Sequence, residues 1–195
     1  MAIVYVVRHG RVASVPTDPA NPELSLEGRS QAVAVAEELS ARLPGKLPIL
    51  SSPLRRCLET AAPLSKLWRV ELVVEPRVAE VPGPPAATLP RDEWLRRALS
   101  SDWPELIQLG QALQKGYDTT LSGWRENVVK AVLACRQDTV IFSHFVPLNV
   151  LTGKALHSER VACFRPDHTS ISIFETSGDD IRLLESGREM PSQVS

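Results

Sequence analysis

A short apolar run near the start of the chain, from Ala2 to Val7, constrains the fold most. It is rich in residues that favour β-structure and too short for a typical helix, so it predicts a buried strand. Arg8, His9 and Gly10 follow it directly. Because ligands bind beyond the carboxyl ends of the strands in open α/β sheets, we expect these residues to face a ligand site.

The side chains of Arg8 and His9 together fit an anionic ligand. A guanidinium group can hold an anion while an imidazole nitrogen attacks it. Gly10 would let the backbone turn, or approach the ligand closely. Such a triplet alone is a weak signal, so the remaining sequence decides whether it is chemical or structural.

Composition excludes several classes of protein. The 195 residues, 21.4 kDa, fit one domain over 1–195 with a substantial core. A net charge of −1 gives no general attraction to nucleic acid or to an anionic membrane. No apolar run approaches the ~20 residues that a membrane-spanning helix needs. We therefore expect neither a nucleic-acid nor a membrane partner.

Cysteine and histidine usage points in the same direction. The three cysteines are odd in number and widely spaced, and no signal-peptide pattern precedes the first strand, so we expect reduced thiols in a cytoplasmic protein. Cys57 and Cys135 are expected to be small core residues. The four histidines are scattered without metal-ligand spacing, so we expect no metal ion and no cofactor.

Apolar periodicity alternates between strand and helix along most of the chain. Further strands are predicted at 47–51, 70–74 and 139–142, and helices over 25–43, 52–64, 121–135 and 146–156. Ser25 is the expected N-cap of the first helix, and Ser52 with Pro53 the expected start of the second. Two more strands are expected around 170–173 and 181–183. This order predicts an α/β protein with a mostly parallel central sheet and helices on both faces.

Residues 82–118 form the least regular segment. Prolines open it, and two short helices are expected, one around 91–99 and one starting at Asp102, which has a capping-box spacing to Glu105. The segment is either a helical packing insert or a lid over the substrate. Its large aromatic residues are Trp94, Trp103 and Tyr117.

Two guanidinium groups and two imidazoles are expected at one edge of the sheet. Arg8 and His9 follow the first strand, Arg56 lies in the first turns of the helix after the second strand, and His144 follows a late strand. Arginine forks suit phosphate oxygens, so this edge is predicted to be an anion site.

These residues, with their neighbours, resemble the histidine phosphatase superfamily, which has the phosphoglycerate mutase-like fold, a three-layer sandwich. The resemblance covers residues 3 to about 175. It implies that His9 is the phosphorylated nucleophile, that Arg8, Arg56 and His144 bind phosphate, and that Glu80 is the proton donor. The matching segments are Arg8-His9-Gly10, Leu24 to Ala32, Ser51 to Ala61, Glu80 and Ser143-His144.

The chain departs from the family pattern around the expected pocket. Family members often have Thr and Asn where Val12 and Val15 stand, and glycines where Phe145 and Val146 stand. The substrate pocket is thus left open by the resemblance. Other candidates are expected to be structural or solvent-exposed: His157 and His168, and Arg91, Arg96 and Arg97, of which the arginines could instead hold a second anionic group.

The favoured function is a metal-independent phosphomonoester hydrolase that acts on a small phosphorylated metabolite through a phosphohistidine. A phosphoglycerate-type mutase is an alternative, although such mutases generally have longer insertions. A protein (phosphohistidine) phosphatase is another, although its smallest relatives lack much of 82–118. A non-catalytic phospho-ligand binding module would not need His9 or Glu80. The sequence does not indicate the substrate or the oligomeric state.

Overall fold

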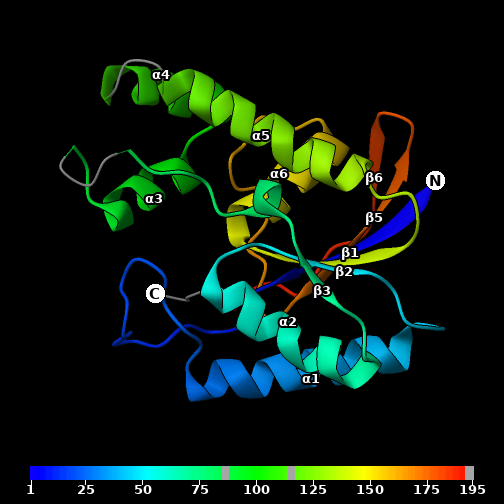
Figure 1. Cartoon of the computed structure of the whole chain (residues 1–195). Helices are drawn as coiled ribbons and strands as arrows, with labels where there is room; N and C mark the ends of the chain where they lie inside the picture. Colours follow the sequence, from blue (N-terminus) through cyan, green and yellow to red (C-terminus); the bar gives the residue numbers. More distant parts are fainter. Residues whose placement is uncertain (85–87, 114–116, 192–195) are drawn as a thin grey trace.

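The computed structural model of the chain describes residues 1–84, 88–113 and 117–191. A six-stranded sheet lies at its centre, with strand order β3-β2-β4-β1-β5-β6, and helices cover both faces (Figure 1). In chain order the elements are β1 (Ala2–Arg8), α1 (Leu26–Arg42), β2 (Ile49–Ser51), α2 (Arg55–Trp68), β3 (Leu72–Val74), the 3-10 turn η1 (Pro76–Val78), α3 (Arg91–Ser100), α4 (Trp103–Leu113), α5 (Tyr117–Leu133), β4 (Thr139–Ser143), α6 (Phe145–Leu156), β5 (Ile171–Ser177) and β6 (Asp180–Glu185).

The sheet is mixed. Strands β3, β2, β4 and β1 are parallel, and the β1–β4 register places Arg8 opposite Ser143. Strand β5 runs antiparallel to β1, and β6 antiparallel to β5. The predicted α/β class with a mostly parallel sheet and helices on both faces is confirmed, and the antiparallel strands are those of the chain's tail.

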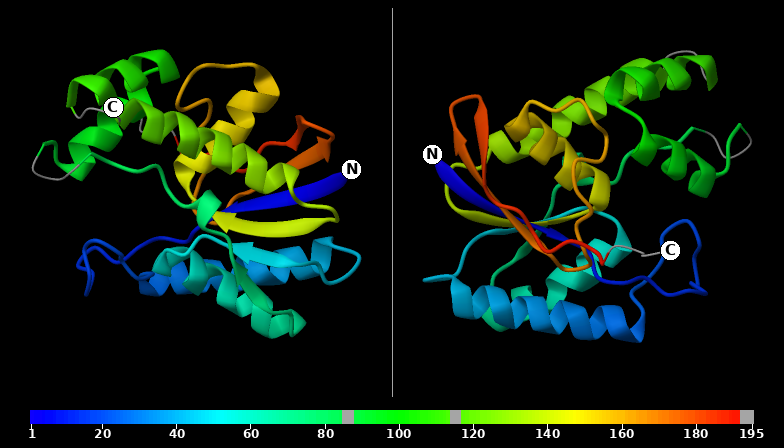
Figure 2. Two further views of the ribbon diagram at one scale, coloured as in Figure 1. Left: turned by 45° about the horizontal axis from the view of Figure 1, so that its top comes forward. Right: turned by 180° about the vertical axis from the view of Figure 1, so that it is seen from behind.

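Each face of the sheet buries its own apolar cluster, because neighbouring side chains on a strand point to opposite faces. Val7 and Phe142 pack with α1 and α2, whereas Val6 and Ile141 pack with α5 and α6. The two helical layers lie on opposite sides of the sheet in both views (Figures 1 and 2). This burial on both faces explains why β1 and β4 read as continuous apolar runs.

Local signals fixed some helix starts and misplaced another. Ser25 caps α1, its Oγ accepting a hydrogen bond from the amide of Gly28 at 2.9 Å, as predicted. Asp102 and Glu105 exchange the expected capping-box bonds, at 2.9 and 3.4 Å. The prediction that Ser52 caps the second helix was wrong: α2 begins at Arg55, with Leu54 as its N-cap.

The segment 82–118 is described in part, since residues 85–87 and 114–116 lie outside the described residues. Its helices α3 and α4 lie toward the same end of the sheet as the loop that follows β1 (Figure 2). Trp94 and Trp103 are fully buried in the cluster beneath them, so both aromatics pack the core rather than face a ligand. The side chain of Tyr117 lies outside the described part.

None of the helices within the described residues is both long enough and apolar enough to cross a membrane.

Candidate active site

His9 and His144 meet at the carboxyl edge of the sheet. Because β1 and β4 are parallel neighbours, the residues that follow them are adjacent, and the centroids of the two imidazole rings are 5.2 Å apart. The amide of His9 donates a hydrogen bond to the carbonyl oxygen of Ser143 at 3.0 Å, which ties the two strand ends together. Both histidines are buried, with 7% and 0% of their surface exposed.

The tautomer of His9 follows from its hydrogen bond. Its Nδ1 lies 2.8 Å from the carbonyl oxygen of Gly10, which can only accept, so Nδ1 holds the proton. In the neutral ring the lone pair is then on Nε2. Burial, together with the charges of Arg56 and Arg8, lowers the pKa of His9 well below 6.5. His9 therefore presents an unprotonated nitrogen at neutral pH.

The backbone after His9 is docked on the first turn of α1. A Cβ at Gly10 would lie 2.7 Å from the carbonyl oxygen of Gly28, and one at Gly28 would lie 2.0 Å from that of Arg11. The amide of Arg11 donates to Oε1 of Gln31 at 2.9 Å. Gly10 therefore allows a close approach of the backbone to this helix. This packing explains the motif from Leu24 to Ala32.

Arg8 lies beneath Phe145, with its guanidinium carbon 5.3 Å from the ring centroid, a cation–π distance. Its Nη1 donates to the carbonyl oxygen of Pro166 at 2.8 Å. Its Nε is buried and has no hydrogen-bond partner within the described part of the chain. Burial lowers the pKa of Arg8. An anion in the site would supply the acceptor that Nε lacks.

Arg56 and Arg55 are neighbours in the sequence but have different surroundings. Thr60 Oγ1 accepts from the amide of Gly10 at 3.0 Å and donates to the carbonyl oxygen of Arg56 at 2.6 Å, which fixes α2 against His9. The charge of Arg56 lowers the pKa of both site histidines. Arg55 instead pairs with Glu59 at 2.7 Å and with Glu23 at 3.3 Å, in the loop after β1.

His144 is held by two residues near the start of α2. Its Nε2 lies 2.7 Å from Oγ of Ser52 and 3.4 Å from Sγ of Cys57. The thiol of Cys57 donates to the carbonyl oxygen of Ser143 at 3.2 Å. Burial, then the proximity of His9, lowers the pKa of His144 well below 6.5. Ser52, the wrongly predicted helix cap, is thus a contact of this imidazole.

Glu80 contacts the start of α6, the helix that follows His144. Its Oε1 accepts from the amide of Val81 at 2.9 Å and from that of Val146 at 3.3 Å, which leaves Oε2 to bear a proton. Burial raises the pKa of Glu80 above 4.5, although Arg56, Arg91 and Arg8 oppose the rise. A buried carboxyl group whose pKa is raised is a candidate proton donor in the same site as the neutral imidazoles.

His168, which was expected to be structural or exposed, also lies in the site. Its ring centroid is 6.1 Å from that of His9. Sequence alternation around 170–173 indicated a strand but not its direction. Because β5 is antiparallel, it begins at the edge where β1 and β4 end, and this brings His168 to His9.

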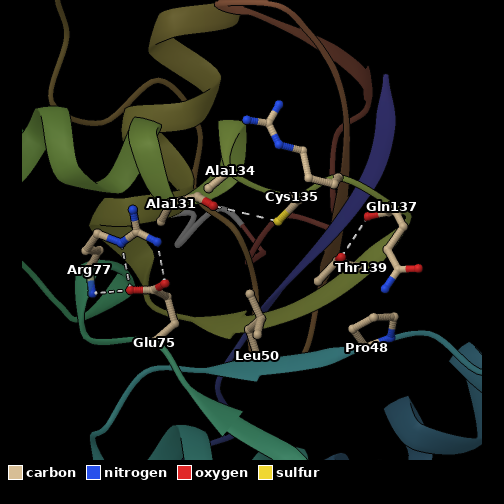
Figure 3. Close-up of a pocket in the computed structure, with 10 residues that line it drawn as sticks. Pro48, Leu50, Glu75, Arg77, Ala131, Ala134, Cys135, Gln137 and Thr139 are labelled. Carbon is tan, nitrogen blue, oxygen red and sulfur yellow. Dashed lines mark hydrogen bonds and ion pairs between the residues drawn. The ribbon is translucent and has the colours of Figure 1, made fainter.

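A separate hollow of ≈ 360 Å³ lies between the end of α5 and strands β2 and β4 (Figure 3). Leu50, Ala131 and Cys135 line it, and the Glu75–Arg77 ion pair closes one end. It contains none of the predicted site residues. Within the described residues, no three His, Cys, Asp or Glu side chains are grouped to hold a metal ion.

The chain belongs to the histidine phosphatase superfamily (branch 1), whose family model matches residues 4–188. It is also similar to the uncharacterized protein Rv0525 of Mycobacterium tuberculosis, with 34% identity over 213 residues, 98% of this chain and 97% of that protein.

Solved structures share the fold. The phosphoserine phosphatase of Entamoeba histolytica in complex with 3-phosphoglyceric acid matches with a TM-score of 0.68 and 21% identity, over 97% of this chain and 98% of that one. The mycobacterial glucosyl-3-phosphoglycerate phosphatase Rv2419c with VO3 matches with a TM-score of 0.63 and 21% identity, over 98% of this chain and 100% of that one. The predicted phosphoglycerate mutase-like fold is confirmed.

Proposed function

We propose that the protein is a metal-independent phosphomonoester hydrolase that acts on a small phosphorylated metabolite through a phosphohistidine at His9. The observation that supports this best is the state of the His9 ring. Its Nδ1 proton is engaged by the Gly10 carbonyl oxygen at 2.8 Å, and burial, together with the charges of Arg56 and Arg8, lowers the pKa of the ring and keeps it neutral. The same cations that keep the nucleophile unprotonated also attract a phosphate dianion.

In the first step Nε2 of His9 attacks phosphorus, the N–P bond forms, and the bond to the ester oxygen breaks. Arg8, Arg56 and His144 stabilise the charge on the phosphoryl oxygens from fixed positions. Glu80 gives its Oε2 proton to the departing alkoxide. Burial raises the pKa of Glu80, and a bound dianion raises it further, so both favour the protonated form that this step needs.

In the second step water attacks the phosphohistidine. Glu80, now a carboxylate, takes a proton from this water, and the N–P bond breaks to release inorganic phosphate and the neutral imidazole. Every proton and electron pair is accounted for by the chain's own residues and water.

A small substrate is supported by what the structural neighbours' names state. They include phosphatases of phosphoserine and of glucosyl-3-phosphoglycerate. We further propose that the chain forms a single domain over 1–195, and that α3 and α4, within the segment 82–118, cover the substrate, since they stand at the same end of the sheet as the β1–α1 loop (Figure 2).

The experiment is hydrolysis of p-nitrophenyl phosphate, with and without EDTA. We expect turnover that resists the chelator, is inhibited by vanadate, and is lost in His9→Ala. His157→Asn is the matched control, because His157 is an exposed histidine whose φ of 54° asparagine tolerates. Full turnover in His9→Ala would refute the proposal. Binding of phosphate esters without turnover would identify a binding module, and phosphoryl transfer between positions of phosphoglycerate a mutase.

A further inference from the structure

The site contains a third imidazole that the mechanism above does not use. His168 precedes β5, and its ring lies 6.1 Å from that of His9 with the planes inclined at 57°. Strands β4 and β5 flank β1 on opposite sides, so His168 and His144 approach His9 from its two flanks. His168 therefore lies within reach of a substrate held at His9.

The backbone beside His168 adopts an unfavourable conformation. Thr169 has a φ of 55°, which is rare for a β-branched residue. Two backbone hydrogen bonds to Arg8 hold this turn. The amide of Thr169 donates to the carbonyl oxygen of Arg8 at 3.0 Å, and the amide of Arg8 donates to the carbonyl oxygen of Ser170 at 3.2 Å. Conformations of this kind persist where surrounding structure enforces them, and they concentrate at functional sites.

The charge state of His168 limits what it can bind. Burial, then the charges of Arg8 and Arg11, lower the pKa of His168 to about 4, although the charges of Asp167 and Glu27 oppose this. The ring is thus neutral near pH 7. A neutral imidazole has one N–H donor and one acceptor lone pair, which matches a hydroxyl group better than an anion.

The position of His168 fits the alcohol part of the ester rather than its phosphoryl group. Arg8 and Arg56 provide the cationic groups of the site, and the neutral ring of His144 is its fully buried part. The His168 side chain is 22% exposed, whereas His144 is 0% exposed, so His168 lies closer to solvent. The alcohol part must project toward solvent when the phosphoryl group occupies the buried side.

We propose that His168 binds the substrate by hydrogen bonding a hydroxyl group on the alcohol part of the phosphate ester, so that the enzyme prefers polyol phosphates over simple alkyl phosphates. This inference rests on the proposed function, which identifies phosphate esters as the substrates. It makes His168 a residue that determines which of them is preferred.

The test measures binding, so that it does not depend on turnover. Glycerol 3-phosphate and propyl phosphate are titrated calorimetrically into His9→Ala protein, with His168 intact, as His168→Ala or as His168→Asn. His157→Asn serves as a matched histidine control. With His168 intact, we expect glycerol 3-phosphate to bind about threefold to tenfold more tightly than propyl phosphate. This preference for glycerol 3-phosphate should vanish in His168→Ala. Propyl phosphate should bind equally well to the protein with His168 intact and to His168→Ala. His168→Asn should keep part of the preference for glycerol 3-phosphate.

Equal weakening of both ligands in His168→Ala would overturn the inference, because His168 would then act on the phosphoryl group or the fold. No preference in the protein with intact His168 would overturn it too. The proposed function is tested separately by hydrolysis of p-nitrophenyl phosphate in the wild-type protein. A hydroxyl preference without hydrolysis refutes only the proposed function, and hydrolysis without the preference refutes only the role of His168.

Discussion

Replacing Ser52 with alanine tests how the second imidazole of the site is held. The Ser52 hydroxyl lies 2.7 Å from Nε2 of His144, and both residues are fully buried. Without it this nitrogen keeps only the weak thiol contact of Cys57 at 3.4 Å. We therefore expect the ring to lose its fixed orientation toward the phosphoryl group.

The size of the effect follows from the cost of a buried polar atom without a partner, about 1–3 kcal/mol. Since about 1.4 kcal/mol corresponds to a factor of ten, kcat/KM for p-nitrophenyl phosphate should fall roughly fivefold to a hundredfold. The effect should appear mainly in kcat, because a fixed donor matters most where charge develops.

Ser51→Ala is the matched control. Ser51 is equally buried, but its hydroxyl donates to the carbonyl oxygen of Ser52 at 2.9 Å and not to an imidazole. It should lower the free energy of unfolding by about 1 kcal/mol and leave kcat/KM within about twofold of wild type. Equal losses of kcat/KM in the two variants, or no loss in Ser52→Ala, would refute the reasoning.

Four further predictions concern charged and titratable groups. Arg56→Ala should lower kcat/KM by about 10²–10³, as loss of a preorganised donor does, whereas Arg55→Ala, which breaks contacts to Glu59, Glu23 and Thr17, should leave kcat nearly unchanged; steady-state kinetics compares them. Glu80→Gln should slow hydrolysis of alkyl phosphates by about 10² or more and that of p-nitrophenyl phosphate less, since p-nitrophenolate leaves without a proton. Because burial raises the pKa of Glu80, its contribution to the free energy of unfolding falls as pH rises, so Glu80→Gln should unfold at higher urea than wild type at pH 8; a lower midpoint contradicts this. Burial lowers the pKa values of His9, His144 and His168, so below pH 6.5 the folded protein binds fewer protons than the unfolded chain. The free energy of unfolding should therefore be highest above pH 6.5 and fall toward pH 4. Urea unfolding should show a shallower fall in His168→Asn.

The sequence predicted the parts of the structure that local pattern determines. Strands β1 and β4 are buried on both faces, so each is a continuous apolar run whose position in the sequence was clear. Ser25 and Asp102 followed the local rules for helix caps. The residues that follow these two strands converge because parallel neighbours end at one edge.

Contacts between distant segments were beyond the sequence. Ser52 followed by proline reads as a helix start, but its hydroxyl is used by His144, 92 positions later, and α2 starts at Arg55 instead. The place of His168 depended on the direction of β5, which alternation does not reveal. Phe145, which replaces a family glycine, contacts the Arg8 guanidinium, a pairing that only the fold brings about.

The central claim is that the Nε2 atom of His9 accepts the phosphoryl group. The most direct measurement is acid-free mass spectrometry of the protein quenched during turnover of a phosphate monoester, with each histidine peptide assigned. We expect a phosphoryl adduct on His9 that disappears as substrate is exhausted and is absent from His9→Ala. An adduct on another residue, or turnover with no adduct on His9 under conditions that trap phosphohistidine, would contradict the account.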